Sequence, residues 1–210
     1  IKIMNTIILL ASLGGFAMLA EIFKLRKLVY PVVLIGLLGV VAVTIMDRNA
    51  KPLNAIFNNM IVFDHYAVMF SIVMVSTLVL WMLLAQKNLD DSVTVSDNVS
   101  LVIFSLVGAV LMVCYANLTM LFLGIEILSI PVYILAGSNK TSLSSNESAL
   151  KYFLMGAFAT GFFLFGIAMV YGATASFDLI KISEVVFSGA SNSKVLLSTG
   201  IIWSSNLDSD

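Results

Sequence analysis

Residues 118–137, which read LTMLFLGIEILSIPVYILAG, decide the fold. At about 1.5 Å per residue, such a stretch forms a helix roughly 30 Å long, which matches the hydrocarbon core of a bilayer. Its one charged residue, Glu126, lies near the middle. An acid at that depth costs on the order of 2.5–3.5 kcal/mol on insertion scales. We therefore expect Glu126 to face protein or water and to relay a proton or an ion.

The whole chain has the composition of a membrane protein. Of its 210 residues, 60% are hydrophobic and 11% are charged, with a mean hydropathy of +1.05, whereas about 25% of the residues in a soluble domain are charged. The chain has no basic tract of the kind that predicts nucleic-acid binding. With one cysteine, Cys114, and one histidine, His65, the chain lacks the residues for a disulfide framework, an iron–sulfur cluster or a metal site, and we expect no cofactor.

About six apolar stretches reach the roughly 17–25 residues that a transmembrane helix needs. They are Met4–Phe23, Leu28–Met46, Tyr66–Ala85, Val99–Tyr115, Leu118–Gly137 and Ala149–Gly172. Pro31 would lie in the first turn of the second stretch, where its missing N–H costs nothing. Tyr115–Asn117 leaves room only for a tight turn, and Ser144–Glu147 has the composition of a cap for the sixth helix.

A seventh apolar stretch, Val195–Trp203, has nine residues, which are too few to cross a bilayer as a helix. We expect residues 195–210 to be a seventh helix that is cut, with a polar end. The predicted fold is all-α: a polytopic transmembrane helix bundle of about six complete spans plus a truncated seventh. Residues 1–210 are expected to form a single membrane domain.

The basic residues give a weak indication of orientation. Lys24, Arg26 and Lys27 lie between the first two predicted spans, which favours the cytoplasm for that loop. Lys87 and Lys140 would fall on the same side, but the totals on the two sides hardly differ.

The fifth predicted helix carries a polar stripe at helical spacing, made of Thr119, Glu126, Ser129 and Tyr133. Pro131 has no N–H and would leave the carbonyl of the residue four positions earlier without its helical donor. A carboxylate beside a free carbonyl and hydroxyl groups can hold water. The alternative is a structural glutamate that joins helices by hydrogen bonds, although an amide or a hydroxyl group would do so at lower cost.

The start of the sixth predicted helix carries a second candidate, Lys151. It follows Glu147 by four residues, the favourable order for an ion pair on a helix. A lysine near a helix end can also extend its ammonium group to the membrane surface, without any role in transport. On the same helix, Gly156 with Thr160 and Ala157 with Gly161 form pairs of small residues that permit close helix packing.

Two stretches of the chain resemble a known family. Residues 121–137, LFLGIEILSIPVYILAG, resemble the fifth helix of subunit N of respiratory complex I, the proton-pumping NADH–quinone oxidoreductase. Residues 147–158, ESALKYFLMGAF, continuing to Tyr171-Gly172-Ala173-Thr174, resemble its sixth helix. The resemblance implies an antiporter-like membrane subunit, homologous to components of multisubunit sodium/proton antiporters.

The resemblance also implies roles for single residues. Glu126 matches the family's proton-channel acid, and Lys151 matches a lysine of its charged set. Members of the family have further lysines on later helices, so this chain is expected to be an N-terminal fragment that does not pump alone. Its partners would be other membrane subunits of complex I and the lipid bilayer of a bacterial inner membrane, while other subunits handle NADH and quinone.

Two alternatives to this function remain open from the residues. The chain could belong to a multisubunit cation/proton antiporter. It could also be a non-catalytic membrane scaffold in which Glu126 only fixes the position of one helix against another.

Overall fold

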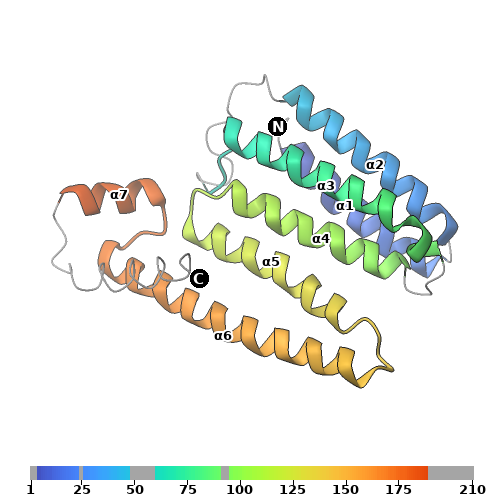
Figure 1. Ribbon diagram of the computed structural model, residues 1–210. Coiled ribbons are helices and arrows are strands. Elements are labelled where there is room, and N and C mark those ends of the chain that lie inside the picture. Colours follow the sequence, from blue (N-terminus) through green and yellow to red (C-terminus); the bar gives the residue numbers. More distant parts are fainter. Residues whose placement is uncertain (1–3, 24–25, 48–59, 91–94, 189–210) are drawn as a thin grey trace.

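The computed structural model describes residues 4–23, 26–47, 60–90 and 95–188, and these residues form an all-helical bundle (Figure 1). The described part contains seven helices. They are α1 (Met4–Ile22), α2 (Arg26–Asp47), α3 (His65–Asp90), α4 (Val95–Val113), α5 (Leu118–Ala136), α6 (Leu143–Thr174) and α7 (Leu179–Ser188). Each of the six predicted apolar stretches falls on one of the first six helices. The predicted seventh helix at Val195–Trp203 lies outside the described residues.

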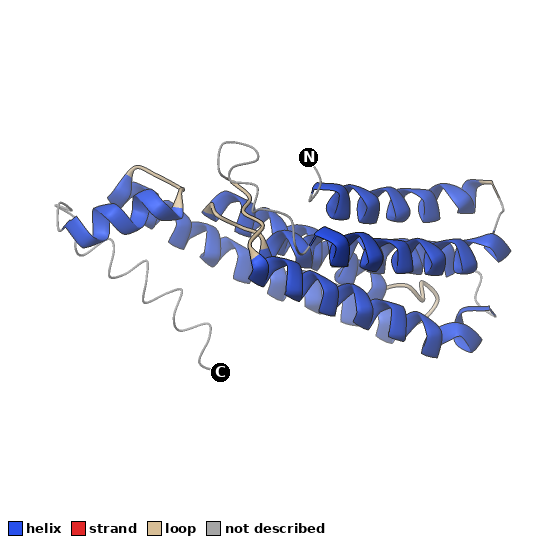
Figure 2. Cartoon of the chain, turned by 90° about the horizontal axis from the view of Figure 1, so that it is seen from above, coloured by secondary structure: helices blue, strands red, loops and turns tan. Residues whose placement is uncertain are grey.

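The helices α1–α6 lie side by side with their axes roughly aligned, and consecutive helices such as α5 and α6 run in opposite directions (Figures 1 and 2). Helix α4 packs against α1, α3 and α5, whereas α6 packs mainly against α5 at the edge of the bundle. The buried core therefore lies among the first four helices. Its largest fully buried side chains include Leu10, Leu37, Met82 and Ile103.

Hydropathy confirms a polytopic membrane bundle. Four helices carry long apolar spans: α2 over Val29–Met46, α3 over His65–Leu84, and the whole of α5 and α6. Two shorter apolar segments, Thr6–Ala20 of α1 and Asp97–Val113 of α4, complete the set in the described part. The segments are apolar on nearly all sides, as expected for helices that face lipid on one side and protein on the other.

Three connecting segments meet at one end of the bundle, where their backbones pair. The Val62 N–H donates to the Cys114 carbonyl at 2.9 Å, and the Leu118 N–H donates to the Phe177 carbonyl at 3.0 Å. These bonds satisfy backbone groups that would be costly to leave unpaired near a membrane. At the same end, the Asp64 carboxylate accepts from the Ala67 N–H at 2.9 Å and so caps the start of α3.

The structure corrects two sequence-based expectations and adds one helix. Helix α2 begins at Arg26, so Pro31 lies inside the helix beyond its first turn, and the charged residues before the apolar run are helical too. Helix α6 begins at Leu143 with Ser142 as its cap, which places Ser144–Glu147 inside the helix and not before it. The short helix α7 was not predicted, because ten residues of mixed polarity give no span signal.

Candidate functional site

Glu126 lies in the middle of α5 and is partly buried. Within the described residues its carboxylate forms no hydrogen bond and no ion pair. A structural glutamate that joins two helices would need a donor on the neighbouring helix, and the described helices supply none. The group is therefore positioned by the backbone of α5 and by the packing of that helix.

The packing of α5 against α4 is unusually close beside Glu126. A Cβ atom added to Gly108 of α4 would overlap the backbone nitrogen of Leu128 and would lie 2.8 Å from the Gly124 carbonyl oxygen. A Cβ atom added to Gly124 would lie 3.0 Å from the backbone nitrogen of Met112. The two glycines thus allow the backbones of α4 and α5 to touch, which is the usual role of small residues between membrane helices.

The same turn of α5 has an irregular hydrogen-bond pattern. Pro131 is inside the helix and has no N–H to donate to the Ile127 carbonyl, one residue after Glu126. The next carbonyl, of Leu128, accepts a hydrogen bond at 3.2 Å from the Ser105 hydroxyl of α4. A side chain of α4 therefore supports the irregular turn, in the way that neighbouring helices support prolines in membrane spans.

Contacts at the opposite edge of α5 give its alignment with α6. The ring of Tyr133 packs edge-to-face on Phe153 with centroids 6.3 Å apart, and its hydroxyl lies over Gly156. Ser145 donates to the Ala136 carbonyl at 2.8 Å. The two helices are antiparallel, and α6 faces α5 near its start with small or aromatic side chains.

This alignment places Glu126 on the α6 side of α5. Glu126 precedes Tyr133 by seven residues, or about 700° of helix rotation, so the two side chains share nearly the same face. Continuing the antiparallel alignment brings Glu126 close to the level of Thr160, whose hydroxyl donates to the Gly156 carbonyl at 3.0 Å. Of the predicted polar stripe, Tyr133 contacts α6 and Glu126 shares its face, whereas the Ser129 hydroxyl donates to the Ile125 carbonyl of its own helix at 2.6 Å.

The structure does not bring Lys151 to Glu126. The Lys151 ammonium lies 2.6 Å from the Glu147 carboxylate, which confirms the predicted pair along α6. Both side chains are largely exposed, so the pair contributes at most about 0.5 kcal/mol. By the same antiparallel alignment, Lys151 is level with the end of α5, roughly 15 Å along the bundle from Glu126.

Sequence reasoning missed three contributors to this site, Ser105, Gly108 and Gly124. Small residues inside an apolar span are the signal for such contacts, and the sequence analysis considered this signal only in α6. There, Gly156 does contact α5, whereas a Cβ atom at Gly161 would meet nothing within 4 Å. In the described ranges, no group of three His, Cys, Asp or Glu side chains could hold a metal ion.

The fold and this site together define a class of protein: a polytopic membrane protein with a carboxylic acid in the middle of an irregular apolar helix. Comparison with known proteins narrows the class. Residues 116–207 match the family described as NADH:quinone oxidoreductase/Mrp antiporter, TM. The match covers α5 and α6 and therefore includes Glu126.

Two curated relatives, both named NADH-quinone oxidoreductase subunit N, are similar to this chain. The chain is 48% identical over 180 residues to NADH-quinone oxidoreductase subunit N of Flavobacterium psychrophilum, covering 85% of this chain and 39% of that protein. It is 42% identical over 182 residues to subunit N of Cytophaga hutchinsonii, covering 86% of this chain and 39% of that protein. The chain is thus a homologue of NADH-quinone oxidoreductase subunit N, and it spans about two fifths of the length of these curated relatives.

Two solved structures have a similar fold. A chain of respiratory complex I from Thermus thermophilus matches with a TM-score of 0.67 and 27% identity, over 83% of this chain and 38% of that one. A chain of an archaeal membrane-bound sulfane sulfur reductase matches with a TM-score of 0.84 and 21% identity, over 95% and 42%. The second match shows the fold alone.

Proposed function

We propose that the chain is part of a membrane subunit of a proton-translocating NADH–quinone oxidoreductase and carries part of its transmembrane proton pathway. The observation that carries the proposal is Glu126, a partly buried acid in the middle of an apolar helix with no bonding partner among the described residues. Because an unpaired acid at that depth is costly, its presence favours a role in ion transfer. The similarity to subunit N supports the same role.

In this proposal, Glu126 takes up a proton from one side of the membrane and releases it to the other. Two features of α5 favour water near the carboxylate: the Ile127 carbonyl lacks a donor at Pro131, and Glu126 shares a helix face with the Tyr133 hydroxyl. Lys151 lies too far away for direct contact. Its ammonium group is paired with Glu147 near the start of α6, so any part of Lys151 in the proton pathway is indirect and is carried here only by the match to the family's lysine.

The proposal also covers the membrane topology. Six helices, α1–α6, cross the membrane; α4 is short, and its apolar segment of 17 residues, Asp97–Val113, spans roughly 26 Å. With ten residues, α7 is too short to cross. Residues 1–210 act as one membrane domain in a bacterial inner membrane, bound to lipid and to other membrane subunits of the complex. NADH and quinone are handled by other subunits.

The test is made in the full-length subunit within its complex. Glu126→Gln keeps the shape and hydrogen-bonding capacity of the side chain but cannot titrate, so proton pumping in vesicles and coupled quinone reduction should fall by about tenfold or more. Glu126→Asp should retain part of the activity. The matched control is Glu184→Gln, an exposed acid on α7, which should pump normally. Full pumping by an assembled Glu126→Gln complex would show that the acid is structural, as in the scaffold alternative.

A second candidate function is supported by the family description, which also names the Mrp antiporter. In that case the chain would belong to a multisubunit cation/proton antiporter, and Glu126 would serve cation-driven proton exchange. Vesicles separate the two functions. Proton uptake driven by NADH and quinone supports the oxidoreductase, whereas uptake driven by a sodium gradient without NADH supports the antiporter.

A further inference from the structure

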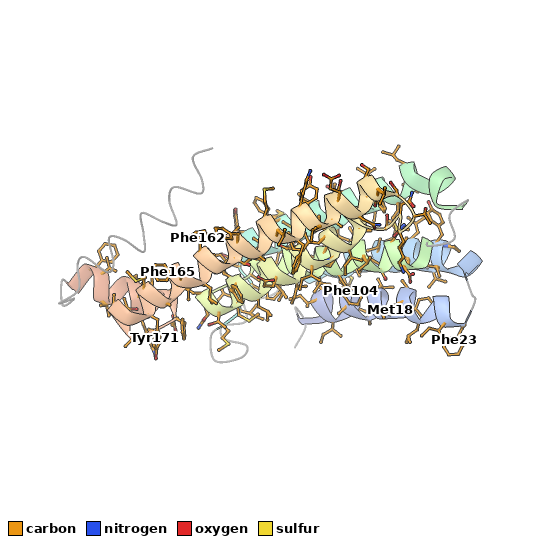
Figure 3. The ribbon with its side chains drawn as sticks, turned by 90° about the horizontal axis from the view of Figure 1, so that it is seen from below. Met18, Phe23, Phe104, Phe162, Phe165 and Tyr171 are labelled. Carbon is orange, nitrogen blue, oxygen red and sulfur yellow. The ribbon has the colours of Figure 1, made fainter. Side chains whose placement is uncertain are left out.

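A cavity of about 290 Å³ lies at the end of the bundle where α1 and α5 end and α4 begins. Its volume is near the lower limit of small-molecule sites, which is roughly 300 Å³. Met18 and Phe104, which belong to two of these helices, are labelled side by side in Figure 3. The cavity is separate from the site in α5, because Glu126 lies ten residues before the end of that helix, or roughly 15 Å away.

The mouth of the cavity carries one acid and one base. Asp97 is in the first turn of α4, and Lys140 follows the end of α5 by four residues; both line the cavity. Neither side chain forms an ion pair with any residue that the structure describes. Backbone contacts hold both positions: the Asp97 carbonyl accepts from Ser100 at 2.8 Å, and the Lys140 carbonyl accepts from Asn146 at 3.1 Å. Opposite charges on one cavity, unpaired with each other, suit a ligand that itself carries both charges.

The wall below these charges is apolar. Leu101 and Phe104 follow Asp97 by one and two turns of α4, and Met18 from α1 and Ile134 from α5 complete this wall. The cavity therefore changes from charged to apolar along the helix direction, toward the middle of the bundle. In a bilayer, the ends of spanning helices lie at the level of lipid headgroups, and the next turns lie at the level of glycerol and acyl chains.

We propose that this cavity binds the headgroup of phosphatidylethanolamine, a zwitterionic phospholipid with a primary amine. Lys140 contacts the phosphate and Asp97 contacts the ammonium, while the apolar wall contacts the glycerol and the first acyl carbons. A glycerol headgroup has no cation for Asp97. A trimethylammonium headgroup has no N–H to donate to the carboxylate, so the charge-assisted hydrogen bond is available only to the amine lipid. The proposal does not depend on proton transfer by Glu126.

The test is photocross-linking in the assembled complex, reconstituted in liposomes that contain a photoactivatable phosphatidylethanolamine with its reactive group on the first acyl carbons. Peptide mass spectrometry should find the cross-link on the segment from Asp97 to Phe104. Lys140→Gln and Asp97→Asn should each lower its yield by about threefold to tenfold, since each removes one charge-assisted hydrogen bond. The matched controls Lys181→Gln and Glu184→Gln, which are exposed on α7, should leave the yield unchanged. A native gel checks assembly of every variant.

Three results would overturn the proposal. The first is an equal yield with photoactivatable phosphatidylglycerol or phosphatidylcholine, which would show no preference for the amine headgroup. The second is an unchanged yield in both assembled cavity variants, which would place the lipid elsewhere. The third is an unchanged cross-link yield when an excess of unlabelled phosphatidylethanolamine is added to the liposomes, which would show labelling without a saturable site.

Discussion

Glu126 is positioned by the packing of its helix, and its carboxylate has no bonding partner among the described residues. Gly124 and Pro131 lie on the same helix, and Gly108 brings the backbone of α4 against the turn that contains the acid. A closely packed backbone and a carboxylate without a described partner would suit the proposed proton exchange, in which the group keeps its position. A structural glutamate would show the reverse, with its carboxylate bonded to a neighbouring helix.

A second residue with a special backbone is Ala175, which ends α6. Its φ of 53° and ψ of 26° lie in the left-handed region, and its N–H donates to the Tyr171 carbonyl at 2.7 Å. The left-handed conformation costs a residue with a side chain roughly 1–2 kcal/mol, and glycine adopts it without strain. We expect Ala175→Gly to raise the free energy of unfolding by about 0.5–1 kcal/mol, measured by titration with a denaturing detergent.

The control for this prediction is a glycine substitution that should change the free energy of unfolding in the opposite direction. Ala159→Gly changes an exposed residue inside α6, where glycine should lower the free energy of unfolding by about 1 kcal/mol. Equal destabilisation by both changes would contradict a strained helix end at Ala175.

At the level of elements, the contact between α4 and α5 depends on Gly108. A methyl group there would overlap the Leu128 backbone, which has no flexible side chain to move aside. We expect Gly108→Ala to separate the two helices, to lower the yield of assembled protein, and to reduce proton pumping in whatever complex forms. Gly39→Ala in α2 is the matched control, since its added methyl group meets nothing within 4 Å in this chain. Normal assembly and pumping with Gly108→Ala would contradict the close approach.

Pro131 tests whether the irregular turn of α5 matters for transport. Pro131→Ala would restore a donor to the Ile127 carbonyl and straighten the helix. If that carbonyl helps to hold water near Glu126, pumping should fall severalfold while the complex still assembles. Pumping assays in vesicles, together with a native gel, measure both quantities. Unchanged pumping would show that the irregular turn is incidental.

The elements show where sequence reasoning succeeds and where it stops. The hydrocarbon core demands a minimum length of apolar helix, so composition alone located α1–α6 and the acid in α5. Helix starts were less accurate, because polar residues such as Ser144–Glu147 can be either a cap or a first turn. The Gly108 contact depends on which faces of two helices meet, a tertiary property that one sequence does not reveal.

For the whole molecule, the buried core and the candidate proton site lie in different parts of the bundle. The buried core lies among α1–α4, while α5 and α6 at the edge have few buried side chains. Large aromatic residues, among them Phe165 and Tyr171, remain exposed along α6 in this chain (Figure 3). The candidate proton site therefore belongs to the more accessible edge of the bundle, where a carboxylate can meet water or a partner without disturbing the core.

The structure fixes which connections share a side of the membrane, and the basic residues then predict which side it is. The ends of α1 and α5 and the start of α4 line one cavity, so residues near Lys27 and Lys140 lie on the same side. Lys24, Arg26 and Lys27 favour the cytoplasm for that side. A green fluorescent protein fused after Lys27 or Lys140 should therefore fluoresce, because it matures in the cytoplasm. Alkaline phosphatase fused after Lys51 or Ala116 should be active, because it matures outside. The reverse pattern would invert the orientation and leave the bundle intact, whereas opposite results at Lys27 and Lys140 would contradict the arrangement of the helices.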